Sequence, residues 1–158
     1  MKIKIICVGK IKEKFLKDAL SEYLKRLSRY IKLEICEVND EKAPEKLKKS
    51  QEEEVKKIEG ERILKHINNG FTVCLSIDGK NMSSEEFSDF IKNKMLESSE
   101  CIYFVIGGSL GLSQHVLKKA DMLLSFSKMT FTHQLMRVIL LEQIYRGFKI
   151  INNEPYHK

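Results

Sequence analysis

The alternation of apolar and polar residues along the chain predicts five β-strands, each bounded by turn-forming residues. The expected strands are Lys2–Val8, Ile31–Val38, Phe71–Ile77, Cys101–Ile106 and Asp121–Ser125. Asn69-Gly70 and Asp78-Gly79 are turn sequences and should bound the third strand. The fourth expected strand is apolar throughout, a pattern typical of a central strand covered on both faces.

Helical periodicity occupies the segments between these strands. Apolar residues recur every three or four positions over residues 15–27, and Ser83 with Glu86 forms a capping box for a helix extending to about Leu96. Ser113 caps a short helix, and a last helix should run from Thr132 to about Gly147. The stretch 39–68 is the most charged, and three pairs at i,i+4 spacing favour an exposed helix without chemistry: Glu52–Lys56, Glu53–Lys57 and Glu61–Lys65.

Strands and helices alternate along the whole chain, which predicts an α/β fold. The sheet should be mostly parallel with helices on both faces. A length of 158 residues with 42% hydrophobic composition supports one well-buried core. We therefore expect a single domain over residues 1–158.

Charge adds a candidate partner to this fold. Lys and Arg number 28 against 22 Asp and Glu, and the excess lies near the two ends of the chain. The first expected helix carries a basic stripe of Lys14, Lys17, Lys25, Arg26 and Arg29. Such a stripe suits the phosphates of a nucleic acid, although a modest basic excess is also common on solvated surfaces.

The four cysteines, Cys7, Cys36, Cys74 and Cys101, are far apart and show no metal-ligand spacing. Because each falls in a β-like apolar run, we expect buried free thiols in a reducing compartment and no metal. The N-terminus does not resemble a signal peptide, and no apolar stretch approaches the length of a membrane span. These features predict a cytoplasmic protein that does not bind a membrane.

Ligands of open parallel sheets bind beyond the carboxyl ends of the strands, and two loops there are candidates. The glycine-rich segment Gly107–Gly111 permits close backbone approach to a ligand or another chain segment, or forms a tight turn. Its spacing fits neither a dinucleotide fingerprint nor a P-loop. The loop Phe126–Phe131 mixes hydroxyl, thioether and aromatic side chains, which suits a purine ring, although an ordinary core-covering loop has the same composition.

The last helix and the tail form a third candidate. The helix is apolar around most of its circumference and lies so near the chain end that a second copy of the chain is expected to cover it, as in a homodimer. His133 and Arg137 lie one turn apart on it, and Glu142 and Arg146 are spaced for an ion pair. The tail ends in Tyr156, His157 and Lys158, side chains that bond or titrate.

Four segments together resemble the bacterial ribosomal RNA large subunit methyltransferase H family, a minimal SPOUT-class enzyme. They are Phe104–Ser109, Leu124–Gln134, Arg137–Arg146 and Pro155–Lys158, and the resemblance extends over the whole chain in length and order. The resemblance implies a SPOUT-type fold whose C-terminal segment threads a loop to form a trefoil knot. It also implies a homodimer whose partner chain helps to shape the RNA site.

The resemblance further implies the cofactor S-adenosylmethionine and, as substrate, N3 of a pseudouridine in 23S rRNA of the assembled ribosome. Carried over by motif, the cofactor contacts are Leu75, Gly107 and the loop residues Phe126, Ser127, Lys128, Met129, Thr130 and Phe131. The expected catalytic residues are His133, Arg137, Tyr156 and His157, with Arg137 on a phosphate or developing anion and His157 or a water as general base.

Two other functions remain compatible with parts of the pattern. A non-catalytic RNA-binding or ribosome-binding module would keep the basic stripe but has no need for the glycine turn, the Phe126–Phe131 loop and the Tyr156-His157 end together. A flavodoxin-like nucleotide enzyme would need a phosphate-binding loop after the first strand. This sequence offers only Gly9 at that place.

Overall fold

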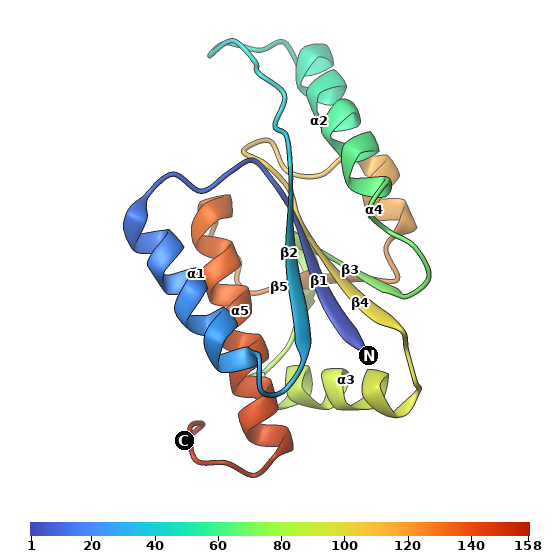
Figure 1. The fold of residues 1–158 in the computed structure, drawn as a ribbon. Helices are drawn as coiled ribbons and strands as arrows, with labels where there is room; N and C mark the ends of the chain where they lie inside the picture. The colour runs from blue at the N-terminus through green and yellow to red at the C-terminus, as the bar shows by residue number, and fades with distance from the viewer.

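The computed structural model describes residues 1–158 and contains one five-stranded sheet with five helices (Figure 1). In chain order the elements are β1 (Lys2–Val8), α1 (Lys14–Leu27), β2 (Lys32–Val38), α2 (Lys49–Leu64), β3 (Phe71–Asn81), α3 (Ser84–Leu96), β4 (Cys101–Ile106), α4 (Gln114–Lys119), β5 (Met122–Ser125) and α5 (His133–Ile151). The strand order is β2-β1-β4-β3-β5, and every pair is parallel. The α/β fold is confirmed, with a sheet that is wholly parallel.

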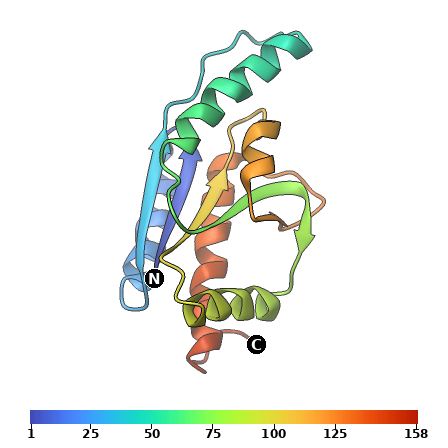
Figure 2. The same cartoon turned by 90° about the vertical axis from the view of Figure 1, so that its right-hand side faces the viewer.

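Alternate residues of the strands feed two cores, one on each face of the sheet (Figure 2). Ile3 and Ile5 pack with Phe104 and with α1, α3 and α5 on one face. Ile6 and Val105 pack with α2 and α4 on the other. All six residues of β4 are buried, which confirms its central position.

The third strand is longer than its sequence pattern predicts, and the expected turn at Asp78-Gly79 is wrong. β3 continues to Asn81, and its register against β5 shifts between Leu75 and Lys80, where the strand bends (Figure 2). A Cβ on Gly79 would lie 2.6 Å from the backbone of Leu123 and Leu124. This glycine therefore permits close approach of two strands, and its role is not to reverse the chain.

Two helix boundaries also differ from the prediction. Residues 39–48 form a loop before α2, and the ion pair that forms on this helix is Glu53–Lys56 at i,i+3 spacing, none of the three expected i,i+4 pairs. α5 continues one turn past Gly147, where it packs against α3: Ser88 Oγ donates to the Gly147 carbonyl at 3.0 Å. The prediction that the last helix ends at about Gly147 is therefore wrong, because this glycine lies where two helices pack.

The last helix is covered mainly by its own chain. Seven residues of α5 are buried, and the helix packs against α1 and α3. The expectation that little of the domain remains to cover it is wrong, because α1 lies beside it (Figure 1). Leu135, on the first turn, is the one large apolar residue of α5 that is exposed, at 40%.

Three of the four cysteines match the expectation of buried free thiols. Cys7, Cys74 and Cys101 are buried free thiols, and burial raises the pKa of Cys7 and of Cys74 to about 12. Cys36 is free and half-buried. None of the helices has the length and apolar character needed to cross a bilayer. The strand order does not test whether the C-terminal segment threads a loop, so the trefoil knot stays a prediction.

Candidate functional site

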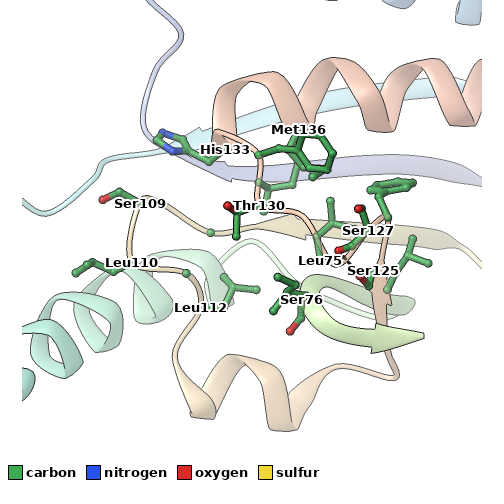
Figure 3. Close-up of a pocket in the computed structure, with 18 of the residues that line it drawn as sticks. Leu75, Ser76, Ser109, Leu110, Leu112, Ser125, Ser127, Thr130, His133 and Met136 are labelled. Carbon is green, nitrogen blue, oxygen red and sulfur yellow. Dashed lines mark hydrogen bonds between the residues drawn. The ribbon is translucent and has the colours of Figure 1, made fainter. Parts of the chain in front are cut away.

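A cavity of about 460 Å³ opens beyond the carboxyl ends of β3, β4 and β5 (Figure 3). We call it the first cavity. It contains most of the residues that the resemblance assigned to a cofactor: Leu75, Gly107, Phe126, Ser127, Met129, Thr130 and Phe131. Lys128 is exposed and does not line it. The glycine-rich segment Gly107–Gly111 and the loop Phe126–Phe131, which α4 and β5 separate in sequence, therefore meet in one pocket. Its size is typical of a site for small ligands.

Hydrogen bonds within the loop after β5 fix its shape. Ser125 Oγ donates to the carbonyl of Ser127 at 3.0 Å, and Ser127 Oγ accepts from the backbone N–H of Met129 at 3.0 Å. Asn81 Nδ2 donates to the Ser125 carbonyl at 3.2 Å, which ties this loop to the end of β3. The loop presents backbone groups beside apolar side chains in a defined arrangement.

The glycine-rich turn forms the opposite wall. The backbone N–H of Gly111 donates to the Gly108 carbonyl at 3.0 Å, closing a tight turn. A Cβ on Gly107 would lie 2.7 Å from the carbonyl carbon of Gly111. The turn is therefore tight, and its backbone lines the cavity. Close approach of these glycines to a ligand stays a prediction.

A second cavity of about 700 Å³ lies beyond the carboxyl ends of β1 and β2. It is more polar than the first and shares with it Gly108, Ser109, Leu110 and His133. Residues of the loop before α2 and Glu59 of α2 close its far side. The two cavities are thus neighbours separated by the glycine-rich turn and one histidine.

His133 lies at this border, on the first turn of α5 and across from Ser109 (Figure 3). Thr132 caps the helix by accepting the backbone N–H of Leu135, which fixes the turn that carries His133. Burial lowers the pKa of His133, and the Arg137 guanidinium lowers it further, while Asp40 opposes both. The imidazole is therefore held neutral and able to accept a proton near pH 7.

Arg137 lies in the interior, not on a cavity wall. Its side chain is 1% exposed, and its guanidinium donates to the carbonyls of Val8 and Gly9 at 2.9 and 2.8 Å and to Glu37 at 2.9 Å. Its Nε has no hydrogen-bond partner. The geometry places Arg137 as a clamp between α5 and the end of β1, where it positions the Gly9 segment below His133.

The C-terminal residues lie at the other end of the sheet from the cavities (Figure 1). Tyr156 donates to Glu142 Oε1 at 3.2 Å, and His157 Nε2 lies 2.7 Å from Glu85 of α3. Glu142 also pairs with Arg146 at 2.6 Å, as the spacing predicted. Burial raises the pKa of Tyr156 to about 12, with Glu142 as a further cause. Tyr156 and His157 line neither cavity of their own chain.

Comparison with known proteins assigns this arrangement to a family. The family model described as "Predicted SPOUT methyltransferase" matches residues 1–157. The chain belongs to this SPOUT methyltransferase family. Relatives named "Ribosomal RNA large subunit methyltransferase H" are 60% identical in Clostridium botulinum and 58% identical in Carboxydothermus hydrogenoformans, with complete coverage of both chains in each case.

Two solved structures share the fold of this SPOUT methyltransferase. A probable methylase family protein from Haemophilus influenzae matches with a TM-score of 0.57 at 13% identity over 99% of this chain and 70% of its own. A putative methyltransferase from Legionella pneumophila, solved with bound S-adenosylmethionine, matches with a TM-score of 0.51 at 10% identity over 94% and 66%.

Sequence reasoning missed several wall residues of this SPOUT methyltransferase. Leu112 and Met136 line the first cavity, and Glu59 lines the second. Leu112 directly follows the glycine-rich segment already named, and Met136 lies one helical turn beyond Thr132, so helical spacing would have indicated it. Glu59 lies in the charged stretch 39–68, which was expected to form an exposed helix. Its only sequence signal is the apolar pair Val55 and Ile63, one turn away on either side, which indicates that this side of the helix faces inward.

Proposed function

We propose that this chain is an S-adenosylmethionine-dependent methyltransferase that methylates N3 of a pseudouridine in 23S rRNA of the assembled ribosome. The observation that carries the proposal is the full-length match, at 58–60% identity, to proteins named for methylation of large-subunit ribosomal RNA. The first cavity supplies the matching site at the strand ends. A ribosomal substrate implies action in the cytoplasm.

The residues of the first cavity fit the cofactor. Aspartate, glutamate, lysine and arginine are absent from its walls, which combine apolar side chains with the hydroxyls of Ser125, Ser127 and Thr130 and with loop backbone. Such a lining suits an adenosine better than a polyphosphate. When bound, S-adenosylmethionine supplies an electrophilic methyl group on a sulfonium sulfur.

Substituting Gly107 by alanine is expected to weaken S-adenosylmethionine binding by more than 10-fold. The new Cβ would overlap the carbonyl group of Gly111, at 2.7 and 2.9 Å from its carbon and oxygen, so the turn must move into or away from the pocket. Calorimetric titration of the cofactor measures the change, with thermal unfolding as a check that the protein is folded. A folded variant with wild-type affinity would separate the turn from the binding site.

His133 is positioned to take the proton that leaves N3. N3 of the base is a weak nucleophile until its proton is removed or shared, and a neutral imidazole at the border of the two cavities meets that need. The proton passes to the imidazole as the N3–carbon bond forms and the methyl–sulfur bond breaks. We therefore prefer His133 to His157 as the base within one chain.

Tyr156 and His157 act, in this proposal, from the partner chain of a homodimer. They lie away from the cavities of their own chain but close to Glu142 and Arg146 on an ordered tail. Met129 and Phe131 of the first cavity are 76% and 40% exposed, and Leu135 on the first turn of α5 is 40% exposed. These three apolar side chains offer a surface for a second copy. Sedimentation equilibrium tests the dimer.

Reversing Lys17 and Lys25 to glutamate is expected to weaken ribosome binding and lower its salt dependence by about one unit of slope per lost phosphate contact. These are the two members of the basic stripe without an ion-pair partner; Lys14, Arg26 and Arg29 pair with Asp18, Glu22 and Glu154. Cofactor affinity should be unchanged. The matched control reverses Lys118 and Lys119 of α4, and equal weakening by both double variants would remove the stripe from the RNA site.

A non-catalytic ribosome-binding module remains the alternative function. Equilibrium binding discriminates the two, because only the enzyme requires S-adenosylmethionine. Saturable binding of the cofactor that is lost on alteration of the first cavity supports the enzyme, and ribosome binding without any cofactor binding supports the module.

A further inference from the structure

The second cavity adjoins the place where the methyl group is transferred, yet the cofactor does not account for it. It shares Gly108–Leu110 and His133 with the first cavity and extends from there to the loop before α2. Its volume of about 700 Å³ is ample for a nucleotide. A methyl acceptor must approach from a side that the cofactor leaves open, and this cavity is such a side.

The wall of the second cavity carries two lysines and four carboxylates: Lys10, Lys12, Asp40, Glu41, Glu45 and Glu59. Arg62 pairs with one of these carboxylates, Glu41, at 2.7 Å. Lys10 and Lys12 are exposed members of its wall in the segment after β1. Glu59 is buried, whereas Asp40 is exposed and lies beside Gly9 with His133. Lysines suit a phosphate backbone, while carboxylates accept hydrogen bonds from base N–H groups.

Glu59 is the buried carboxylate of this wall, and one of its two oxygens receives no hydrogen bond from the protein. It is 5% exposed, and its Oε2 accepts the backbone N–H of Glu41 at 3.0 Å, whereas its Oε1 has no protein partner. Oε1 lies 3.3 Å from the position that a Cβ on Gly108 would occupy, so the carboxyl group sits beside the turn between the two cavities. Burial raises the pKa of Glu59, because desolvation outweighs the single hydrogen bond from Glu41. Oε1 can therefore accept a hydrogen bond from a donor that a ligand brings into the cavity.

We propose that the second cavity receives the target nucleotide and that Glu59 accepts a hydrogen bond from N1–H of its pseudouridine base. The inference rests on the proposed function. Pseudouridine carries an N1–H group where uridine presents C5–H, which is a poor donor. Glu59 is thereby a specificity-determining residue: it senses the atom that distinguishes the modified base from its precursor.

The chemistry of the base agrees with the position of Glu59. N1 and N3 of pseudouridine flank the same ring carbonyl, so a base with N1 at Glu59 keeps N3 close to Gly108 and His133. The acceptor nitrogen then lies at the border of the two cavities, beside the imidazole proposed to take its proton.

The test compares Glu59→Gln with the wild type on ribosomes that carry either pseudouridine or uridine at the target position. Glu54→Gln is the matched control, since it makes the same change on an exposed residue of α2. The wild type and the control should prefer pseudouridine. Glu59→Gln should lower kcat/KM on pseudouridine ribosomes by about 10-fold or more, as loss of a hydrogen bond to a charged group does, with the rate on uridine within about 2-fold.

Glu59→Asp serves as a second variant in case the amide disturbs the loop at Glu41. It keeps the charge but shortens the side chain by one methylene, and it should reduce the preference for pseudouridine in the same way. Equal losses on both ribosomes would show that Glu59 only supports the fold, and an unchanged preference in Glu59→Gln, or a wild type without preference, would also overturn the inference. Failure of the wild type to methylate either ribosome would instead refute the proposed function.

Discussion

Alanine at position 133 is expected to lower kcat by about 10²- to 10⁴-fold, the contribution typical of a general base. The imidazole lies at the border of the two cavities, and no other imidazole or carboxylate of the chain lines both. Affinity for S-adenosylmethionine should change by only a few fold, since backbone and apolar side chains form most of the first cavity. Single-turnover rates at saturating ribosomes and cofactor measure the effect.

The pH dependence of the wild type provides a second readout. The neutral imidazole is the active form, so the rate should rise with pH and then level off. Because the pKa of His133 is lowered from its ordinary 6.5, by burial above all, the plateau should begin below the pH at which a solvated histidine would give it. In His133→Ala, this rise of the rate with pH should be absent. If His157→Ala loses it and His133→Ala keeps near-normal turnover, the base is His157 of the tail.

Replacing Arg137 by methionine is expected to destabilise the fold by roughly 2–4 kcal/mol, because buried carbonyl groups lose their donor. Methionine keeps much of the apolar stem but leaves the carbonyls of Val8 and Gly9 and the Glu37 carboxylate without their donor. Chemical denaturation monitored by circular dichroism measures the loss. A change below about 1 kcal/mol would mean that the clamp does not hold the fold.

Glu37→Gln is the matched comparison for Arg137. Its side chain is 37% exposed, and the amide oxygen can still accept from Arg137 and from the Ile11 backbone, so its cost should be much smaller. Comparing the effects of Arg137→Met on stability and on ribosome affinity separates two possible roles of Arg137, the structural clamp and a phosphate-binding residue. A phosphate-binding arginine would affect ribosome affinity more than stability, whereas the clamp should affect stability first.

The fold was predictable for strands that are buried on both faces and for helices that are buried on one face. The apolar run of β4, the Ser83 capping box and the Ser113 cap each matched the structure. Two of the errors fell at glycines. Gly79 was expected to form a turn but permits close approach of two strands, and Gly147 was expected to end a helix but lies inside α5, where α5 packs against α3. Both are tertiary contacts, which leave no local sequence pattern.

The candidate site was predictable in part. The glycine-rich turn and the loop after β5 follow strands whose ends must meet at one edge of a parallel sheet, so their union in one cavity followed from topology. The roles of Arg137 and Glu59 did not follow. Burial decides both, since the same guanidinium or carboxylate is a surface group or an internal one according to how the helices pack.

The most direct test of the function is transfer of a labelled methyl group. The purified protein is incubated with methyl-labelled S-adenosylmethionine and, in separate reactions, intact ribosomes, isolated large subunits or naked 23S rRNA, and the labelled nucleotide is then mapped. We expect label on N3 of a single pseudouridine of 23S rRNA, strongest with intact ribosomes. Absence of label from every substrate, or label on another atom, would contradict the account.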